Sequence, residues 1–441
     1  MKKTIKLAVV AALALGATSA FATNGSNMIG MGAKARGMAG VGIGMSHGAE
    51  SALVNPALIT TVKGTEISFG GTIFMPDVKN QNSLIVPTGA PGTATPTGSA
   101  DESSSADSKA NMNVIPEVSL ATKITDHFYA GIGMWGTAGM GTDYRAPADS
   151  GQMNMVTNLQ LMQFGVPLAY KIDNFSIAVT PILQYGSLDI NYNMSPNLQN
   201  AMAWMMTGGA QGNPAATFGG ATRPSNVGSG VAQSLKFGYN LGLAYEISGL
   251  TLGATYTSRI DMQYDYVLSN AIQGFGVGSY TNNKLSTPAT YGVGASYAFG
   301  ANTVAIDYKR IQWSDAKGYK DFEWDDQDVI SLGYEYNAKN WAARVGYNYA
   351  SSPISEQSQS YTNSAGLNGG TINTFNLLGF PAIVQSHYAI GGTYNLTEQA
   401  SVDLAFTYAP EETNTYKNFL NQDITTKHSQ TGLSAQLNYD F

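Results

Sequence analysis

The chain of 441 residues contains no cysteine and little charge. Without cysteine it forms neither a disulfide framework nor a cysteine-ligated metal or iron–sulfur site, and thiol chemistry is excluded. Only 12% of the residues are Asp, Glu, Lys or Arg, about half of the ~25% that is usual in globular domains. The net charge of −7 argues against a basic nucleic-acid-binding face. A chain of this length with so few charges is poorly suited to water as its only solvent.

Long apolar runs are also missing, apart from a short one near the N-terminus. A basic start over residues 1–6 precedes an apolar core over residues 7–15, and residues 20–22 (Ala-Phe-Ala) are typical of a cleavage site. We therefore predict a signal peptide over residues 1–22 and export to the envelope of a Gram-negative bacterium. No later segment approaches the ~20 apolar residues of a transmembrane helix. If this protein crosses a membrane, we expect it to do so with strands.

Alternating apolar and polar residues run through most of the remaining chain. In residues 250–266 the even positions are mainly apolar or aromatic, and the odd positions are polar or small. A period of two indicates a strand with one apolar and one polar face, so we expect a single long strand here. Charges in several such segments fall on the face opposite the aromatic side chains. A barrel in lipid requires this, because a charge facing lipid at mid-depth costs ~2–4 kcal/mol.

The alternating segments predict an all-β fold, a transmembrane antiparallel β-barrel of about 14 strands over residues 64–441. The predicted strands begin near Glu66, Asn113, Phe128, Thr157, Phe175, Leu235, Leu250, Lys284, Asn302, Gln327, Trp341, His387, Ser401 and Gln430. Even-numbered connections are tight and odd-numbered ones are long, above all residues 77–111, 195–233 and 353–385. Short turns at one end and long loops at the other are typical of outer-membrane barrels, with the long loops outside. A soluble β-sandwich or solenoid is the alternative, but it explains neither the charge deficit nor the asymmetry of the loops.

Residues 23–63 do not alternate and are rich in glycine, methionine and alanine. A barrel of this size has a lumen wider than the self-filling eight-strand kind. We therefore predict that residues 23–63 fold into the lumen as a hatch, or plug. A disordered periplasmic tail is the alternative, although the methionines and the low charge argue against permanent solvation.

Short motifs are spread over nearly the whole mature chain. They occupy residues 32–42 (Gly-Ala-Lys-Ala-Arg-Gly-Met-Ala-Gly-Val-Gly), 49–57, 287–294, 311–314, 324–326, 333–336, 344–347 and 352–353. Together they resemble the FadL/TodX family of outer-membrane transporters of long-chain fatty acids and aromatic hydrocarbons. The resemblance implies an N-terminal hatch and a place in the bacterial outer membrane. The hatch motif residues that it implies are Gly37, Gly40, Asn55, Pro56 and Ala57.

Two predicted external loops carry apolar clusters. The candidate residues for outer hydrophobic capture are Met202, Trp204, Met205, Met206, Ile272 and Phe275. Flexible methionine beside an aromatic ring suits loosely specified apolar ligands, and the resemblance assigns a hydrophobic groove to these loops. The alternative is that these side chains only pack one loop against another.

The third predicted strand, residues 128–144, has an unusual density of glycine. Glycine within a strand marks bulges and bends, and the resemblance implies a kink here that opens the barrel wall beside the hatch. The candidates for this kink and lateral opening are Gly133, Gly136 and Gly139. Our hypothesis is that ligand descends to the hatch, that the hatch shifts, and that ligand leaves sideways into the outer membrane. The alternative is that these are small residues facing a crowded hatch.

A fatty acid needs a cation for its carboxylate. The candidates are Lys34 and Arg36 in the hatch, and Lys236, Arg259 and Arg344 on the predicted lumen face. The alternative for each is an ion pair with an acidic residue of the barrel. The acidic residues available are Glu246, Asp261, Asp307, Glu335 and Asp403. The sequence does not choose between a carboxylate ligand and a neutral hydrocarbon.

Enzymatic chemistry has little support, because the four histidines are far apart in the sequence. A Ser–His pair must lie on one face, and adjacent strand residues point to opposite faces. We predict no catalytic residue, no cofactor and no metal. The predicted function is transport of hydrophobic small molecules by a monomer, with outer-membrane lipid, lipopolysaccharide and the barrel assembly machinery as partners and no nucleic acid. A surface adhesin or receptor and a general diffusion porin are the alternatives.

Overall fold

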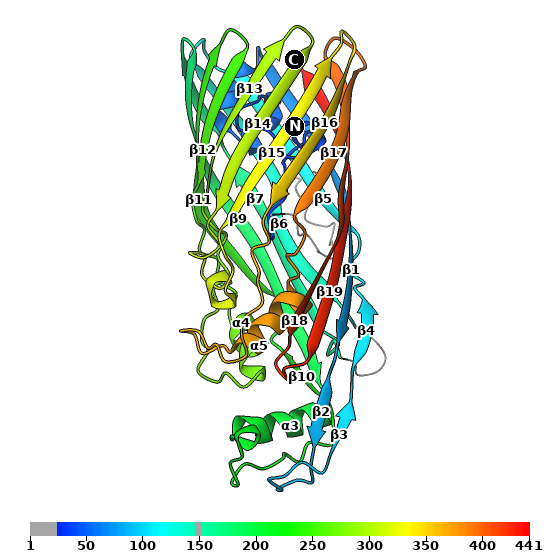
Figure 1. The fold of residues 1–441 in the computed structure, drawn as a ribbon. Coiled ribbons are helices and arrows are strands. Elements are labelled where there is room, and N and C mark those ends of the chain that lie inside the picture. The colour runs from blue at the N-terminus through cyan, green and yellow to red at the C-terminus, as the bar shows by residue number, and fades with distance from the viewer. Residues whose placement is uncertain (1–23, 146–150) are drawn as a thin grey trace, which may run out of the picture.

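The structure is a computed structural model that describes residues 24–145 and 151–441, so the predicted signal peptide lies outside the described residues. The wall is a closed antiparallel barrel of 14 strands, as the alternation predicts (Figure 1). The wall strands are β1 (Thr65–Asn82), β5 (Asn113–Lys123), β6 (Phe128–Asp143), β7 (Val156–Gly165) continued by β8 (Leu168–Ile172), β9 (Phe175–Met194), β11 (Ala232–Ile247), β12 (Leu250–Thr257), β13 (Thr290–Phe299), β14 (Asn302–Ile311), β15 (Gln327–Asn337), β16 (Trp341–Ala350), β17 (Ser386–Asn395), β18 (Ala400–Lys417) and β19 (Asp423–Asp440).

Closure occurs between the first and the last strand. Ile67 of β1 lies opposite Tyr439 of β19 on one side and Leu120 of β5 on the other. Every wall strand therefore has a neighbour on each side, and the backbone of the wall is paired except along part of the boundary between β5 and β6.

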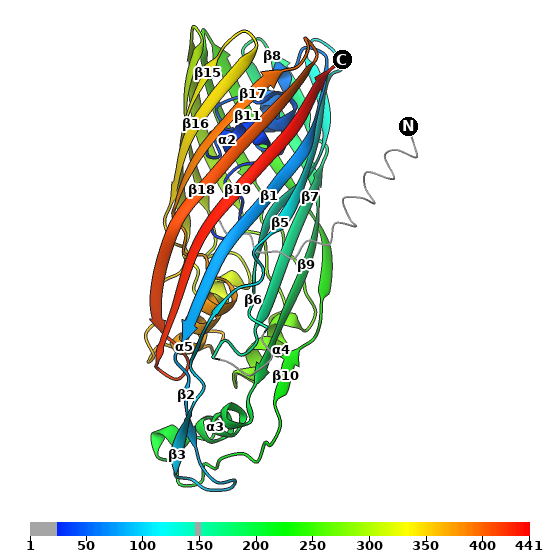
Figure 2. The same ribbon diagram turned by 90° about the vertical axis from the view of Figure 1, so that its right-hand side faces the viewer.

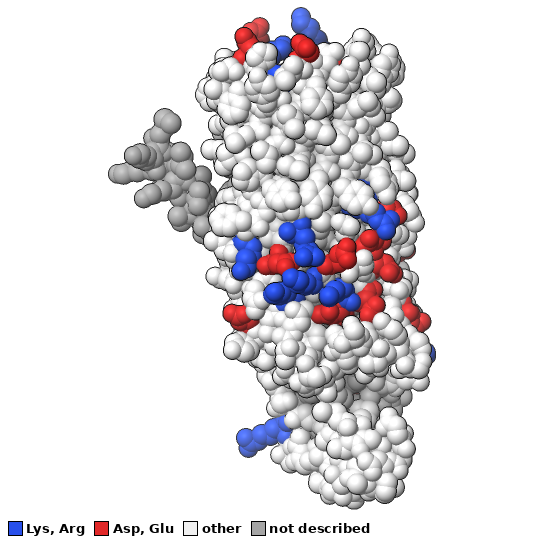
Figure 3. All heavy atoms as spheres, turned by 90° about the vertical axis from the view of Figure 1, so that its left-hand side faces the viewer, with Lys and Arg blue, Asp and Glu red and all other residues white. Residues whose placement is uncertain are grey.

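The outer face of the wall is apolar. In β11, Leu241, Leu243 and Tyr245 are exposed, whereas Gly242 and Ala244 between them are buried. Figure 3 shows that charge on one side of the molecule is confined to the end with the short turns, a band near mid-length and an isolated position farther along. An outward-facing charge at the end of a strand is Arg310, whose Nη1 lies 3.1 Å from the Asp328 carboxylate. Charge is thus kept away from the apolar part of the wall, as the cost of exposing it to lipid requires.

The connections differ at the two ends of the barrel. Tight turns such as 173–174, 248–249 and 300–301 lie at one end, here called the short-turn end, together with the C-terminus (Figure 1). In one of them Ser248 and Gly249 have φ values of 47° and 85°, the positive values that a two-residue hairpin requires. The other end, here called the long-loop end, carries the long connections. The predicted asymmetry of the connections is confirmed.

One strand prediction is wrong. The strand expected over residues 250–266 ends at Thr257, and β13 begins at Thr290 rather than near Lys284. Beyond Thr257 the chain turns inward, and Ile260, Met262 and Tyr264 are buried in an apolar core. The period of two persists because residues 258–264 pass beside residues 284–287 through isolated bridges. Alternation shows that one face of a segment is apolar. It does not say whether that face meets lipid or packs into a protein core.

Two assemblies occupy the long-loop end. The first, here called the cap, consists of residues 258–289, 312–326 and 351–385. It contains α4 (Val267–Gly274), α5 (Gly369–Thr374), the 3-10 helix η4 (Tyr319–Phe322) and the π-helical turn η5 (Phe375–Gly379). The second, here called the arm, consists of residues 83–107 and 195–224 and extends beyond the barrel (Figure 1). It contains β2 (Ile85–Thr88), β3 (Gly98–Asp101), β4 (Ser104–Asp107), α3 (Pro196–Met206) and the 3-10 helix η3 (Gly209–Gln211), and it is followed by β10 (Ser225–Gly228).

Residues 24–63, here called the N-terminal segment, lie inside the barrel, and Figure 2 shows its helix α2 behind the strands of the wall. The segment contains α2 (Ala33–Gly37) and the 3-10 helices η1 (Gly48–Leu53) and η2 (Pro56–Thr61). Helix α2 contacts β16–β19, η1 contacts β1, β5 and β6, and η2 contacts β8, β9 and β11. None of the helices in the described part of the chain is long and apolar enough to cross a membrane.

Candidate functional site

An outer cavity of about 470 Å³ lies between the arm and the cap. Met202, Met205 and Met206 of α3 line one side, and residues 275–279 and Phe419 line another. Its lining thus joins four of the six residues predicted for hydrophobic capture. Unbranched, polarizable methionine side chains adapt to ligands of different shape, and Gln211, Ser279 and Asn368 add polar groups to the lining. The cavity therefore suits a molecule that has both apolar and polar parts.

The other two predicted capture residues lie elsewhere. Trp204 is stacked on Phe218 within the arm, with ring centroids 5.0 Å apart, and its Nε1 donates to the Ala94 carbonyl at 2.8 Å. Ile272 is fully buried in the core of the cap. For these two residues the structure supports packing of loop against loop, which was the alternative interpretation.

An inner chamber of about 120 Å³ lies in the lumen, between the N-terminal segment and the wall. Its lining mixes apolar and uncharged polar side chains. They include Met28 and Ile29 of the N-terminal segment, Trp135 and Thr137 of β6, and Ile182 of β9. The chamber therefore adjoins both the N-terminal segment and the third strand of the wall.

Lys309 of β14 is the cation in the lining of this chamber. Its Nζ lies 3.5 Å from the Ile29 carbonyl oxygen, and it makes no ion pair with any residue that the structure describes. The neighbouring carboxylate on the same face, Asp307, instead accepts backbone N–H groups of Gly42, Ile43 and Gly44 at 2.7, 2.7 and 3.2 Å. The sequence prediction missed Lys309. The alternation alone predicts that Lys309 faces the lumen, because it lies two residues after Asp307 and on the same face of the strand.

Most of the predicted carboxylate-binding cations are occupied by the protein itself. Arg36 is 1% exposed, and its two terminal nitrogens bind the Glu117 carboxylate of β5 at 2.7 and 2.8 Å. Arg344 binds Glu335 at 2.6 Å, and Arg259 binds Asp261 at 2.9 Å. Arg259 follows the end of β12, and its Nη1 donates to the Asp315 carbonyl of the cap at 3.2 Å, so it belongs to the cap and not to a wall strand. Lys236 is exposed and does not line the inner chamber.

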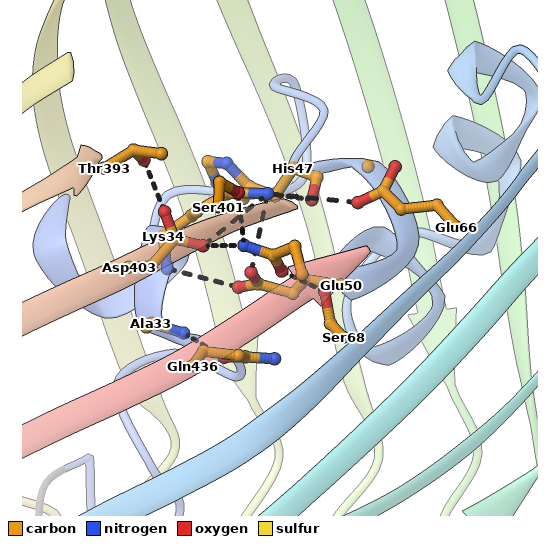
Figure 4. Close-up of polar contacts among 12 residues, drawn as sticks. Ala33, Lys34, His47, Glu50, Glu66, Ser68, Thr393, Ser401, Asp403 and Gln436 are labelled. Carbon is orange, nitrogen blue, oxygen red and sulfur yellow. Dashed lines mark hydrogen bonds and ion pairs between the residues drawn. The ribbon is translucent and has the colours of Figure 1, made fainter. Parts of the chain in front are cut away.

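Lys34 is the centre of a buried group of charges between the N-terminal segment and the wall (Figure 4). Its Nζ lies 3.7 Å from Glu50, 3.9 Å from Glu66 and 3.7 Å from Asp403. Burial raises the pKa of the Glu50 carboxyl to about 8, although the charge of Lys34 acts in the opposite direction. Burial likewise lowers the pKa of His47 to about 3, so its ring is neutral and its Nε2 lies 2.8 Å from the Val41 carbonyl oxygen. The contacts of Lys34 with Glu66 of β1 and Asp403 of β18 join the segment to the wall, whereas those of Glu50 and His47 are internal to the segment.

The hatch motif residues shape the N-terminal segment. Asn55 caps η2 by accepting from Ala57 N at 3.1 Å, and its amide donates to Ile43 O at 2.8 Å and Leu243 O at 3.0 Å. Pro56 is the first residue of η2, a position where a missing N–H has no cost. Gly40 has a φ of 93° and lies against the Ile29 carbonyl, so a side chain would collide there.

Gly37 packs against the backbone of β17: a Cβ at Gly37 would lie 3.1 Å from the Cα of Gly391. A larger residue would separate α2 from the wall. The motif residues thus set the close approach of the N-terminal segment to the barrel, and none of them contributes a charged group.

The third wall strand, β6, is irregular where the glycines occur. Its register with β7 shifts between Gly136 and Ala138, and its pairing with β5 stops at Trp135, opposite Glu117. Strand β5 continues to Asn113 paired with β1 alone. The wall therefore has a gap in its hydrogen-bond ladder between residues 113–116 of β5 and residues 136–143 of β6.

The N-terminal segment binds β6 at this gap. Met28 N donates to Thr137 O, and Gly139 N donates to Ser26 O, each at 3.1 Å. The Met28 side chain packs with Phe74 of β1 and Ile115 of β5 in a small buried cluster. Residues 26–28 thus complete the backbone hydrogen bonding of β6 that β5 no longer supplies.

The glycines near the gap allow close packing. A Cβ at Gly136 would lie 2.6 Å from Cγ2 of Ile115, and one at Gly133 would lie 2.8 Å from Leu53 and from the ring of Trp135.

No group of three or more His, Cys, Asp or Glu side chains able to hold a metal occurs in the described ranges.

The sequence matches a known family over most of its length. Residues 7–362 match the family described as outer membrane protein transport protein (OMPP1/FadL/TodX). The long-chain fatty acid transport protein of Shigella flexneri is 24% identical over 411 residues, which are 83% of this chain and 85% of that protein. An uncharacterized protein of Chlorobium limicola is 41% identical over 87 residues, which are 19% of this chain and 43% of that protein.

Solved structures share the fold. A FadL homologue of Pseudomonas aeruginosa has a TM-score of 0.68 at 17% identity, over 96% of this chain and 100% of that chain. The toluene transporter TodX of Pseudomonas putida has a TM-score of 0.65 at 18% identity, over 94% of this chain and 99% of that chain. At identities this low the similarity demonstrates a common architecture and nothing about the ligand.

Proposed function

The chain belongs to the OMPP1/FadL/TodX family of outer membrane transport proteins, and on this premise we propose that it carries long-chain fatty acids or similar apolar acids across the outer membrane. The family consists of transporters and channels, so the protein is an outer-membrane transport protein and not an enzyme. Its relatives are named for different ligands, long-chain fatty acids in one case and toluene in another. The choice between an acid and a neutral hydrocarbon must therefore come from the cavities of this chain.

The observation that carries the proposal is the unpaired Lys309 in the inner chamber. Lys309 is half-buried in the lining of the chamber, and a carboxylate ligand there would form a charge-assisted hydrogen bond with it. The buried cations considered above, Arg36 and Arg344, already have carboxylate partners at 2.6–2.8 Å. A fatty acid bound with its carboxylate at Lys309 supplies the missing partner.

Capture begins at the outer cavity. Its methionine-rich lining adapts to flexible chains, and its volume of about 470 Å³ lies within the ~300–1,000 Å³ range of small-molecule sites. An apolar molecule gains most of its binding free energy there from loss of water-exposed surface. The outer cavity therefore serves as the first, weakly selective site.

Release occurs sideways at the gap between β5 and β6. The inner chamber reaches Trp135 and Thr137 of β6, and residues 26–28 cover the gap through two backbone hydrogen bonds. Movement of residues 24–31 both enlarges the chamber and uncovers the gap. The apolar cluster at the gap presents apolar side chains to a ligand that leaves there. This route retains the predicted roles of the hatch and of the third strand.

A neutral monoaromatic hydrocarbon is the second candidate ligand, and the size of the inner chamber favours it. The chamber measures about 120 Å³, close to the engineered cavity of about 150 Å³ that binds benzene. A long-chain acid fits only partly until residues 24–31 move. The two candidates differ in their dependence on Lys309.

Substitution of Lys309 distinguishes the two ligands. Lys309→Met should weaken binding of palmitate to the purified protein by about 10- to 100-fold, because a hydrogen bond to a charged group contributes about 1.5–3 kcal/mol. Lys309→Arg should retain much of the affinity, and binding of methyl palmitate should be unaffected by either variant. Lys236→Met is the matched control, since this lysine lies outside the chamber. Equal palmitate affinity of the Lys309→Met variant and the native protein would refute the proposal of a fatty acid. The neutral hydrocarbon would then be the better candidate ligand.

A further inference from the structure

The outer cavity and the inner chamber are separated by one apolar core. Phe275 lines the outer cavity, and Ile182 and Ile311 line the inner chamber. All three side chains belong to the same buried cluster, which fills the mouth of the barrel under the cap. Ligand that moves from the first site to the second must therefore displace part of this core.

Phe275 is the centre of an aromatic group at the outer surface of that core. Its ring centroid lies 5.2 Å from Tyr192, 5.0 Å from Phe375 and 5.1 Å from Phe419. The three partners come from β9, η5 and the connection between β18 and β19. Phe275 is only 5% exposed, although it borders the outer cavity. It closes the inner side of the cavity by contact with all three rings.

The backbone around Phe275 differs from that around two of its partners. Phe275 follows the last residue of α4 and lies between Gly274 and Gly276, with Gly278 two residues farther on. Gly276 has a φ of 86°, and a Cβ at Gly278 would have no neighbour within 4 Å. Glycine admits backbone conformations that other residues do not, so this turn has more conformational freedom than a strand.

Two of the partner rings are held in place. The hydroxyl of Tyr192 donates to the Ala271 carbonyl at 2.6 Å, and Phe375 lies within the continuous helical run of α5 and η5 and is fully buried. In its contacts with Tyr192 and Phe375, Phe275 is the residue that lies on a turn flanked by glycine and that borders the outer cavity. Motion of the Phe275 ring therefore requires less rearrangement than motion of the Tyr192 or Phe375 ring.

We propose that Phe275 is a gate that controls passage of ligand from the outer cavity to the inner chamber. With its ring against Tyr192, Phe375 and Phe419, the passage is closed. Rotation of the ring into the outer cavity opens a path along α4 into the core. An apolar ligand replaces the contacts that the ring gives up, whereas water and ions do not, because exposing this core to water is unfavourable. The gate thus opens for apolar ligands and keeps the barrel closed to solutes in water.

The gate rests on the proposed direction of transport, but it can be tested without any transported ligand. The chain has no cysteine, so Ile272→Cys places a single thiol behind Phe275 on α4, at a position with 0% exposure. Modification of this thiol by a small neutral methanethiosulfonate reagent, added from outside to the barrel in vesicles, reports opening of the core. In the Phe275→Ala background the labelling rate should rise about tenfold or more, as expected when the population of an open state increases by that factor. In the Phe275→Trp background it should fall.

Phe322→Ala is the matched control. Phe322 is buried in the same core and its ring lies 5.6 Å from that of Phe375, but it does not line the outer cavity. It should change the labelling rate much less than Phe275→Ala. Phe275→Leu, which retains an apolar side chain, should give an intermediate labelling rate. It replaces Phe275→Ala in the experiment if the alanine variant does not fold.

Equal labelling in the native and Phe275→Ala backgrounds, or an equal increase with Phe322→Ala, would refute the gate. Entry of palmitate into the same vesicles is measured in parallel. Faster labelling without palmitate entry would support the gate and contradict the proposed ligand. Palmitate entry with no change in labelling would support the ligand and overturn the gate.

Discussion

Replacement of Glu117 by alanine should release the N-terminal segment from the barrel wall. The Glu117 carboxylate is buried and binds both terminal nitrogens of Arg36, and its Oε1 also accepts the backbone N–H of Gly32 at 3.2 Å. Arg36 also donates to the Thr72 hydroxyl of β1. Removal of the carboxylate leaves the Arg36 guanidinium, at 1% exposure, without its counter-charge.

The magnitude follows from the cost of an uncompensated buried charge. Breaking a buried pair by removing one partner costs about 3–5 kcal/mol, which shifts the equilibrium between a seated and an unseated segment by a factor of about 10² to 10³ or more. Single-channel recording in planar bilayers should show openings in the Glu117→Ala protein that the native protein rarely makes. A Glu117→Ala protein as silent as the native one would refute the view that this pair holds the segment in the lumen.

Two further variants separate anchoring from general damage. Asp77→Ala removes the partner of Lys79 in an exposed pair at 3.1 Å, and it should have no effect on conductance because exposed pairs contribute about 0–1 kcal/mol. The double variant Arg36→Met with Glu117→Leu removes both charges and should restore the closed state, since apolar replacement of a whole buried pair is often neutral or stabilising. Openings in the double variant equal to those of Glu117→Ala would show that the side chains serve packing rather than charge compensation.

Two other predictions concern the hatch and the third strand. Deletion of residues 24–60 should raise single-channel conductance strongly, because the lumen is too wide to be filled by the wall residues alone; an already large and steady conductance of the native protein would instead favour the porin alternative. Substitution of Gly136 and Gly139 by valine should slow uptake of palmitate into cells and leave barrel assembly intact, because a Cβ at Gly136 would lie 2.6 Å from Ile115 and would fill the gap beside β6. Unchanged uptake in cells that display normal amounts of the valine variant would count against lateral release.

The sequence was sufficient to predict the wall because lipid imposes a strict rule on it. Every outward position of a strand in hydrocarbon must be apolar, so the alternation in β11 and β16 and the short turns between strands identified the barrel correctly. The same rule failed at residues 258–266. There the apolar side chains of Ile260, Met262 and Tyr264 face the core of the cap. The rule fails because burial in protein and exposure to lipid select the same residue types.

The site was less predictable because it depends on which partners meet in space. Composition located the apolar loops, but only the fold separates Met206, which borders the outer cavity, from Trp204, which is stacked within the arm. Among the cations, the sequence predicts pairing with an acidic residue of the barrel as the alternative to ligand binding but does not assign the pairs. The structure shows two of them, Arg344 with Glu335 and Arg259 with Asp261. The pairing of Arg36 with Glu117 was not foreseen, because their positions are 81 residues apart in the sequence and no local pattern connects them.

The cations in the lumen differ in whether a carboxylate of the barrel neutralises them. Arg36 and Lys34 are neutralised by carboxylates of the barrel and hold the N-terminal segment against the wall. Asp307, on the same face of β14 as Lys309, accepts three backbone N–H groups of the same segment. The Nζ of Lys309 lies 3.5 Å from the Ile29 carbonyl oxygen of the segment. Because both side chains contact the N-terminal segment, displacement of the segment changes the surroundings of Lys309, and we expect the affinity of the inner chamber for an acid to depend on the position of the segment.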